Sequence, residues 1–557
     1  MSFKILRQKW LIVCVLAVCL TLASRIVIAY FLANDEPDDG RAYALLANNL
    51  LEHHVFSLDD KEPYEPTLIR MPGYPLFLAA IYSVFGHGNN TAVRVVQAFV
   101  DTATCVLIAL TAWNWVVDES RRRKALCAAF ALAALCPFVV IYAATIMTET
   151  LATFFAVAMT LAATYAFKAE SRKVKIIWWI VAGLLAGACV TLRPDSGLFA
   201  AGLGLTLVIS GLLMRDESNA EVRRRFLSRV AQTSLHAALF SVAFILLLLP
   251  WTIRNERVFH LFQPLSPAHG EMPGEFVPQG YNMWLRTWVD DQRYIEPMLW
   301  DLDTHPITID EIPASAFDSE EERARVAALF DRYYHPPQEE QANAADNEQA
   351  NNAQGDSSKP GNEESANDNS SDEDESAGDE EKGGEDQSAD ESDQSQDGSE
   401  QAQENQDVEM TPEIDAGFAE IARERITRSP LRYYLWLPAK RAASLWFDTH
   451  SMYYPFSGEL FPLKDLDRDT HQQIWLPLFA ALVWLYTLLA LAGAFFLLRA
   501  RDGASRRWLI LAALMVLPRI AFFSTIENPE PRYVVELFAF TAILGGIALA
   551  RLKIIKN

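Results

Sequence analysis

The sequence predicts an all-α polytopic membrane protein with about ten transmembrane helices, interfacial helices in the first outer loop and a large, partly disordered outer loop. The first observation behind this fold class is a series of apolar runs, most of them long enough to cross about 30 Å of hydrocarbon at about 1.5 Å per residue. The second is that Lys and Arg gather in the segments on one side of these runs. The runs lie near residues 10–32, 92–117, 125–146, 149–167, 176–192, 196–214, 231–251, 475–498, 508–524 and 534–550.

Basic residues set the orientation of the predicted spans. The positive-inside rule places segments rich in Lys and Arg in the cytoplasm. Ten spans put all such segments, and both termini, on that side, and they put residues 33–91, 252–474 and 525–533 on the other. The first run lacks a convincing cleavage site and is expected to remain as an uncleaved anchor. We therefore expect a multi-pass protein of the inner (plasma) membrane. The basic segments are the N-terminus, 121–124, 168–175, 223–225, 501–507 and 551–556.

The chain divides into two membrane modules and a long outer loop. The formal net charge of −23 lies in the loop, because residues 339–409 hold 25 Asp and Glu against only Lys359 and Lys382. A segment with so few aliphatic residues cannot offset a chain entropy of about 1–2 kcal/mol per residue, so disorder is expected. For this acidic segment, a role as a solvated spacer is favoured over a role in attracting cations or a partner. The predicted segments are 1–251 (N-terminal membrane module, with the first outer loop 33–91), 252–335 (ordered outer part), 336–411 (acidic insert), 412–474 (return segment) and 475–557 (C-terminal membrane module).

Several classes of function lack their sequence pattern. The sequence contains no basic face with interleaved aromatic residues, so a nucleic-acid partner is not expected. The pattern G-x-x-x-x-G-K-[ST] is missing, which disfavours direct nucleotide hydrolysis. The sequence lacks an i, i+4 His pair with a carboxylate, the pattern that would predict a metal site on a helix. We therefore expect that no cofactor is required, although outer carboxylates could hold Mg²⁺ or Mn²⁺. The cysteines all lie in apolar runs without CxxC or CxxH spacing, so they are expected to be buried free thiols. They are Cys14, Cys19, Cys105, Cys127, Cys136 and Cys189.

The first outer loop contains two predicted helices. Tyr43, Leu46, Ala47, Leu50 and His54 share one helical stripe, with polar residues opposite. This pattern is typical of a helix that lies along the membrane interface. The second helix is the apolar stretch 73–86, which is too short to span the bilayer upright and is expected to lean into the outer leaflet or to be re-entrant.

Ionisable residues gather at the predicted outer ends of the spans. A charge at the membrane centre costs roughly 3 kcal/mol on insertion scales, so such residues need a functional or structural reason. Carboxylates and guanidiniums on one face suit a reaction that deprotonates a hydroxyl or amine and neutralises a departing phosphate. Arg25 interrupts the first run near its outer end and could reach a lipid phosphate. The other residues of this set are Asp35, Glu36, Asp38, Asp39, Glu149, Arg193, Asp195, Arg254, Glu256, Glu527, Glu530 and Arg532.

Six short motifs, by their order and their spacing to the predicted spans, resemble those of a known family. That family is the GT-C glycosyltransferases of the protein-mannosyltransferase and aminoarabinose-transferase type, including the bacterial lipopolysaccharide-core branch. Met71 stands where the family has a proline, the acidic insert is foreign to the family pattern, and the ordered outer part matches only loosely around residues 280–284. The motifs are Asp39-Gly-Arg-Ala-Tyr43, Arg70-Met-Pro-Gly-Tyr-Pro-Leu-Phe-Leu78, Thr148-Glu149-Thr150-Leu151, Thr191-Leu-Arg193-Pro194, Pro250-Trp-Thr-Ile-Arg254-Asn255 and Arg532-Tyr533.

The resemblance implies an inverting transfer of a sugar from a polyprenyl-phosphate-linked donor to an extracytoplasmic acceptor. It implies that Asp39 is the catalytic base, with Asp38 or Asp35 as substitutes. A structural alternative is that Asp39 caps the N-terminus of the amphipathic helix. Glu149 could polarise the acceptor, hold an arginine, or be an ordinary turn carboxylate. The expected partners are this lipid donor, a glycan, lipid or protein acceptor, and membrane lipids.

Arginines and aromatic residues complete the expected site. The guanidinium groups of Arg70, Arg193, Arg254 and Arg532 are candidates for the donor phosphate, since each offers paired charge-assisted hydrogen bonds; some are expected instead to pair with Glu149, Glu256 or Glu527. Tyr43, Tyr74, Trp251 and Tyr533 could face the sugar, although a membrane-interface belt explains them better. Two other functions stay open: a lipid or glycan transporter or flippase, and a non-catalytic membrane scaffold. Polar residues at one mouth, rather than along a route through the bilayer, disfavour a transporter.

Overall fold

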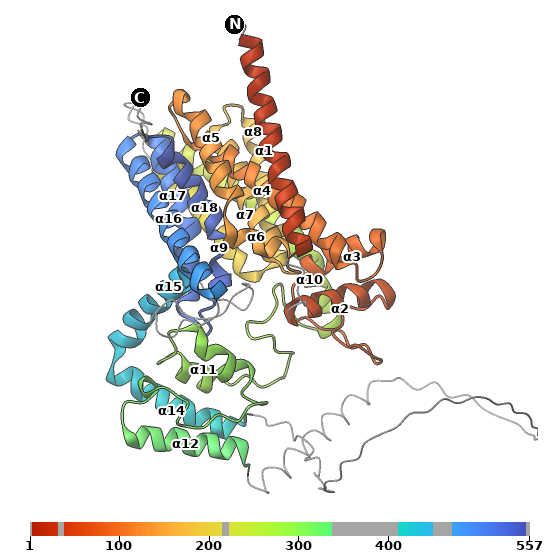
Figure 1. Cartoon of the computed structure of the whole chain (residues 1–557), viewed down its shortest axis with the longest axis vertical. Helices are drawn as coiled ribbons and strands as arrows, with labels where there is room; N and C mark the ends of the chain where they lie inside the picture. Colours follow the sequence, from red (N-terminus) through yellow and green to blue (C-terminus); the bar gives the residue numbers. More distant parts are fainter. Residues whose placement is uncertain (1–2, 32–37, 214–221, 337–409, 449–469, 553–557) are drawn as a thin grey trace, which may run out of the picture.

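The computed structural model describes residues 3–31, 38–213, 222–336, 410–448 and 470–552, and within these ranges it contains helices and no strands (Figure 1). The all-α prediction is confirmed. Nearly all of the acidic insert lies outside the described residues. The helices are α1 (Phe3–Phe31), α2 (Asp38–Glu52), α3 (Gly73–Phe85), α4 (Asn90–Trp115), α5 (Glu119–Ala134), α6 (Pro137–Ala143), α7 (Glu149–Lys168), α8 (Arg172–Leu192), α9 (Gly197–Leu212), α10 (Val222–Phe259), α11 (Gln279–Leu285), α12 (Glu320–Tyr334), α14 (Pro412–Arg428), α15 (Leu437–Phe447), α16 (Thr470–Ala500), α17 (Gly503–Phe523) and α18 (Leu537–Leu549).

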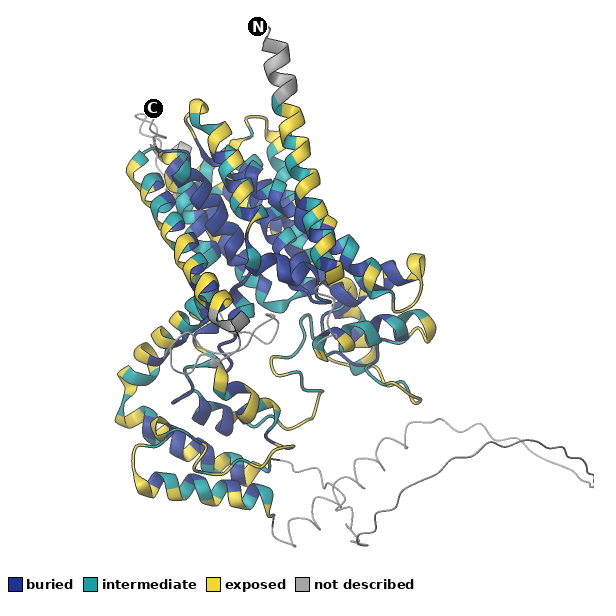
Figure 2. Ribbon diagram, in the orientation of Figure 1, coloured by how far each residue is buried: buried dark blue, intermediate teal, exposed yellow. Residues whose placement is uncertain are grey.

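A bundle of long apolar helices forms the body of a multi-pass membrane protein. In the described ranges, seven helices are long and apolar enough to cross a membrane, and the bent pair α5–α6 makes up to eight. The remaining two predicted spans correspond to α17 and α18, which do not meet that standard; α18 has only 13 residues, or about 20 Å. The count of ten is therefore not reproduced by length and composition. Exposed residues lie along the outer helices of the bundle (Figure 2), and large apolar side chains such as Leu20, Val242 and Leu488 are among them, as a lipid-facing surface requires.

Different structural elements lie at the two ends of the bundle. Helix α1 begins and α18 ends at the same end (Figure 1). At the opposite end lie α2 and α3 of the first outer loop, the small domain of α11, α12 and α14, and α15, which links that domain to the bundle (Figure 1). The long outer loop and the first outer loop therefore meet the bundle at one end, as predicted.

The predicted span 125–146 is broken into α5 and α6, which are bent by 57°. Pro137 opens α6 and lacks an N–H, so the helix cannot run straight through. The carbonyl oxygens at the end of α5 accept hydrogen bonds from the Arg25 guanidinium, at 2.6 Å for Ala134 and 3.4 Å for Ala133. Arg25 Nε also pairs with Asp101 Oδ2 of α4 at 2.8 Å. Arg25 thus ties α1, α4 and α5 together inside the bundle.

Glycines on α8 allow α10 to pack closely against it. Gly183 and Gly187 lie one turn apart, the spacing that brings helix backbones together in membranes. A Cβ atom at Gly187 would lie 2.7 Å from the Phe244 carbonyl oxygen and 2.8 Å from the Leu247 Cβ. Because the nearest atom belongs to the backbone of α10, the two helices would have to separate to admit a side chain.

We expect Gly187→Val to destabilise the folded protein by about 1–3 kcal/mol, the usual cost of forcing extra atoms into a packed interior. Gly204→Val in α9 is the matched control, because a Cβ atom there would meet nothing within 4 Å. Thermal unfolding of the two detergent-solubilised variants measures the difference. Equal losses in both variants would show that helix propensity, and not the α8–α10 contact, decides the outcome.

An aromatic core holds the outer domain together. Trp284 and Tyr281 of α11 pack against Phe330 of α12 and Phe418 of α14, with ring centroids 5.0–6.3 Å apart. The ordered outer part of the long loop is therefore completed by α14, which comes from the return segment. The acidic insert joins two helices that already pack on each other, which is why a long insertion can be accommodated there.

Candidate active site

The first outer loop folds onto the bundle as two short helices. α2 and α3 cover the segments predicted to be interfacial, with Leu46 and Ala47 of α2 buried against the rest of the fold. Asn49, one of the polar residues opposite the apolar stripe, is also buried, because its side-chain amide donates to the carbonyl oxygens of Ser57 and Asp59. The start of α3 is pinned to the end of α8: a Cβ atom at Gly73 would lie only 2.5 Å from the Thr191 carbonyl oxygen.

Asp39 lies between two arginines that come from opposite ends of the chain. Its Oδ1 accepts from Arg70 Nη2 at 2.9 Å, and its Oδ2 accepts from Arg532 Nη1 at 2.9 Å. The Asp39 side chain keeps 24% of its surface exposed. The motif before α3 and the last outer loop are thereby joined at the first turn of α2. Three of the predicted site residues therefore meet at one point.

The charges around Asp39 set its protonation state. Burial disfavours the charged form, but the positive charges and hydrogen bonds of Arg532 and Arg70 outweigh burial and hold the pKa of Asp39 below its ordinary value of 3.8. Asp39 is therefore ionised throughout the neutral pH range. In this arrangement it is a weak base, because protonation removes the negative charge that both guanidinium groups stabilise.

A second ionic network lies deeper in the bundle. Arg193 Nη1 donates to Glu149 Oε1 at 2.6 Å and Arg193 Nε donates to Asp195 Oδ1 at 3.2 Å. Arg519 of α17 pairs with Asp195 Oδ2 at 2.5 Å and with both carboxylate oxygens of Glu536 at 3.1 and 3.2 Å. These five side chains are buried or nearly so, and they join α7, the α8–α9 turn, α17 and the start of α18. Glu149 therefore holds an arginine, one of the roles predicted for it.

Arg519 and Glu536 are not among the predicted site residues. Both lie inside apolar runs that were treated as spans, at 508–524 and 534–550. The signal that could have found them is that an ionisable residue within a span needs an oppositely charged partner. Two such residues of opposite sign in consecutive runs predict a buried pair.

Tyr533 links the two charged groups. Its ring lies under the guanidinium groups of Arg193 and Arg532, with centroid distances of 5.8 and 5.3 Å. Its hydroxyl accepts from Asn528 Nδ2 at 3.0 Å. Burial, opposed by the charge of Arg532, raises the pKa of Tyr533 to about 12, so the phenol stays neutral. Tyr43 also stays neutral, because burial and the charge of Asp39 raise its pKa to about 12.

Tyr74 and Trp251, two of the aromatic residues considered as contacts to the sugar, are buried in packing contacts. Tyr74 is fully buried, its ring lies 5.1 Å from that of Tyr43, and its hydroxyl donates to Gln97 Oε1 at 2.8 Å. Trp251 is buried on α10, where its ring packs edge-on against Phe56 at 5.2 Å. Both residues position the first outer loop rather than face an open site.

Arg254 lies on α10, which continues through Pro250 to residue 259 instead of ending at 251. Its Nη1 donates to the Thr67 carbonyl oxygen at 2.8 Å, and its guanidinium lies 5.0 Å from the Trp251 ring centroid. It anchors the first outer loop to α10, and its predicted role at the phosphate stays a prediction. The same holds for Arg25, which the structure pairs with Asp101 and not with Asp39.

The alternative bases are placed differently from Asp39. The Asp38 side chain is 94% exposed and lies 3.5 Å from Arg41, on the solvent side of the same turn. Asp35 lies outside the described residues. Of the three candidate carboxylates, Asp39 is therefore the one that the described structure brings to Arg70 and Arg532.

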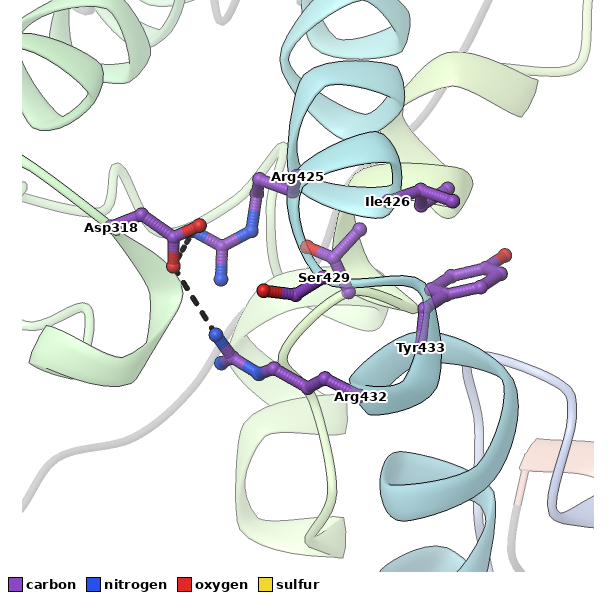
Figure 3. A pocket seen from close by; sticks show the side chains of 7 residues that line it. Asp318, Arg425, Ile426, Ser429, Arg432 and Tyr433 are labelled. Carbon is purple, nitrogen blue, oxygen red and sulfur yellow. Dashed lines mark hydrogen bonds and ion pairs between the residues drawn. The ribbon is translucent and has the colours of Figure 1, made fainter.

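A small polar cavity in the outer domain does not compete as a substrate site. It is lined by residues at the end of α14, and Asp318 already pairs with two of its arginines, lying 3.4 Å from Arg425 and 3.2 Å from Arg432 (Figure 3). It has room for about one water molecule. No group of three or more His, Cys, Asp and Glu in the described part of the chain is arranged to hold a metal ion.

Comparison with solved structures finds matches at low sequence identity. Two of them are structures of the oligosaccharyltransferase AglB from Archaeoglobus fulgidus, one in complex with an inhibitory peptide and a dolichol-phosphate and one tethered to an acceptor peptide. Each match covers 95% of this chain at 12% sequence identity, with TM-scores of 0.44 and 0.43. The chain spans about half of their length, 50% and 49%. ArnT from Cupriavidus metallidurans bound to undecaprenyl phosphate shares 12% identity at a TM-score of 0.35, over 97% of this chain and 78% of ArnT.

Part of the chain matches a known family. A search of curated proteins gave no match. Residues 65–251, however, match the family described as dolichyl-phosphate-mannose-protein mannosyltransferase. The matched segment contains Arg70, Glu149, Arg193 and the helices that hold them, which are among the residues on which the motif resemblance was based. The segment from residue 65 to residue 251 therefore matches the protein-mannosyltransferase family model, in agreement with the motif resemblance.

Proposed function

We propose that this protein is a membrane glycosyltransferase that moves a sugar from a polyprenyl-phosphate-linked donor to an acceptor on the extracytoplasmic side. The observation that carries the proposal is the Asp39 carboxylate held between Arg70 and Arg532 at one end of the bundle. The family match over residues 65–251 supports the donor class, because the family is described by its dolichyl-phosphate-mannose donor.

The proposed reaction is a single displacement with inversion at the anomeric carbon. Asp39 accepts the proton of the acceptor hydroxyl or amine as the acceptor atom forms its bond to that carbon. The bond from the anomeric carbon to the phosphate oxygen breaks, and the polyprenyl phosphate leaves with the electron pair. Guanidinium groups that are already in position when the reaction starts stabilise the charge that develops on the leaving phosphate.

Arg70 and Arg532 are the proposed ligands of the donor phosphate. Each already faces an anion, the Asp39 carboxylate, at 2.9 Å. A donor phosphate at the same guanidinium groups would share their positive charge, so the affinity of Asp39 for a proton would rise when the donor is bound. Arg193 is committed to Glu149 and Asp195, and we assign it the role of holding Tyr533 and the loop around it.

The proposed chemistry needs no cofactor. At the site, a guanidinium supplies the positive charge beside each of two carboxylates: Arg70 beside Asp39, and Arg193 beside Glu149. We expect transfer by the purified protein to be unchanged by EDTA, as measured with a radiolabelled lipid-phosphate sugar. Loss of transfer in EDTA, restored by Mg²⁺ or Mn²⁺, would instead assign a cation to the outer carboxylates.

The test of the function has two parts. Mass spectrometry should find a glycolipid or glycoprotein sugar missing from a deletion strain, and purified protein in vesicles should transfer that sugar from a polyprenyl-phosphate donor. Covalent transfer distinguishes an enzyme from a transporter, which would move an intact glycan without changing its bonds. A full set of glycans in the deletion strain, together with no transfer in vesicles, would leave the scaffold alternative in place.

A further inference from the structure

Glu530 is a buried carboxylate next to the proposed site. Its residue keeps 5% of its surface exposed, and its Oε2 lies 2.7 Å from Arg532 Nε. Its other oxygen, Oε1, has no hydrogen-bond partner among the described residues. An unsatisfied polar atom in a buried position is costly, so such atoms in native proteins call for an explanation.

Arg532 lies between two carboxylates. Its Nη1 faces Asp39 Oδ2 at 2.9 Å and its Nε faces Glu530 Oε2 at 2.7 Å. Pro531 begins the short 3-10 turn that carries Arg532, and the guanidinium lies over the ring of Tyr533 at 5.3 Å. The proline and the ring restrict the backbone and side chain of Arg532, so the guanidinium is held where both carboxylates can reach it.

We infer that Glu530 is a positioning residue that controls the basicity of Asp39 through Arg532. The inference rests on the proposed function of Asp39 as the base and adds a residue that touches neither the donor nor the acceptor. When Glu530 is ionised, it shares the charge of Arg532, and Asp39 becomes a stronger base. When Glu530 is protonated, Asp39 keeps more of that charge and is a weaker base.

The surroundings allow Glu530 to change its charge near neutrality. Burial raises the pKa of Glu530 to about 7, and the charges that face it are Arg532 on its own turn, Glu149 from α7, Asp39 from α2 and Arg193 from the end of α8. The two carboxylates favour the protonated form and the two arginines oppose it. Asp39 itself does not titrate in this range, because its pKa lies below 3.8.

The first experiment follows the Asp39 carboxylate directly in the full-length protein. Infrared difference spectra against Asp39→Asn identify the Asp39 band in the purified, unliganded protein. We expect this band to shift with a midpoint near pH 7 in the wild type, as Arg532 redistributes its hydrogen bonds, and to stay constant in Glu530→Gln. A band that does not move in the wild type, or that moves equally in Glu530→Gln, would overturn the inference whether or not transfer is detected.

The second experiment measures kcat for sugar transfer against pH. The wild type is expected to rise through about pH 7, whereas Glu530→Gln should stay flat and lie about tenfold below the wild type at pH 8, equivalent to one pKa unit in the base. Glu530→Asp keeps a carboxylate and should recover a pH step. Glu527→Gln is the control, because Glu527 contacts His269 and Arg286 rather than Arg532.

The outcomes separate the inference from the proposed function. If Glu530→Gln keeps the wild-type step, or if Glu527→Gln removes it, Glu530 does not control Asp39, although sugar transfer by the wild type would still stand. If the wild type transfers no sugar, the proposed function fails, and the infrared titration alone decides whether Glu530 and Asp39 are coupled through Arg532.

Discussion

Asp39→Asn is expected to lower kcat for sugar transfer by roughly 10²–10⁴-fold, the usual contribution of a positioned general base. The amide is nearly the same size as the carboxylate but cannot accept the acceptor proton. It also loses the negative charge that holds Arg70 and Arg532 at 2.9 Å each. Folding should be little affected, since the Asp39 side chain is partly exposed.

The same substitution should leave donor binding intact or strengthen it. In the wild type, the donor phosphate must compete with the Asp39 carboxylate for two guanidinium groups. The neutral amide of the variant would not compete as an anion, so the dissociation constant for polyprenyl phosphate should stay constant or fall while kcat collapses. A loss of both binding and turnover would indicate instead that Asp39 mainly organises the arginines.

Asp38→Asn is the matched control for the base. Asp38 lies on the same helical turn, but its side chain points to solvent and contacts only the exposed Arg41 among the described residues. We expect this variant to transfer sugar at the wild-type rate. If Asp38→Asn lost activity while Asp39→Asn kept it, the assignment of the base would move to the neighbouring carboxylate.

Local patterns explain which parts of the fold could be predicted. Apolar runs of sufficient length give spans, and the stripe containing Tyr43 and Leu46 gives an interfacial helix, because hydrophobic period is a local property. The bend at Pro137 and the continuation of α10 through Pro250 could not be read in the same way. A proline bends or ends one helix but lies inside another without ending it, depending on which neighbours satisfy the freed carbonyl groups.

The site was only partly predictable for a related reason. Motif residues such as Asp39, Arg70 and Arg532 can be recognised by the short motifs that contain them and by their place in the predicted outer loops. Their pairing cannot be recognised in this way, because the contact between Asp39 and Arg532 joins residues 493 positions apart in the sequence. Which arginine meets which carboxylate depends on helix packing, which sequence periodicity leaves open.

The largest effect on stability is expected at the ion pair between Arg25 and Asp101. Both side chains are only 3% exposed, and the arginine also satisfies carbonyl oxygens at the end of α5. Arg25→Met would leave a carboxylate and these carbonyl groups without their donor in a buried environment. Breaking one partner of a buried pair costs about 3–5 kcal/mol, so the variant should unfold at a markedly lower SDS fraction in mixed micelles.

A double variant and an exposed pair make this test specific. Arg25→Met/Asp101→Leu removes the unpaired charge and should recover part of the loss, although the Ala134 carbonyl remains without its donor. Arg121→Met breaks the solvent-exposed pair with Asp118 and should cost less than about 1 kcal/mol. If Arg25→Met were as mild as Arg121→Met, Arg25 would not tie the bundle together and would be available for the lipid phosphate, as its place in the sequence first indicated.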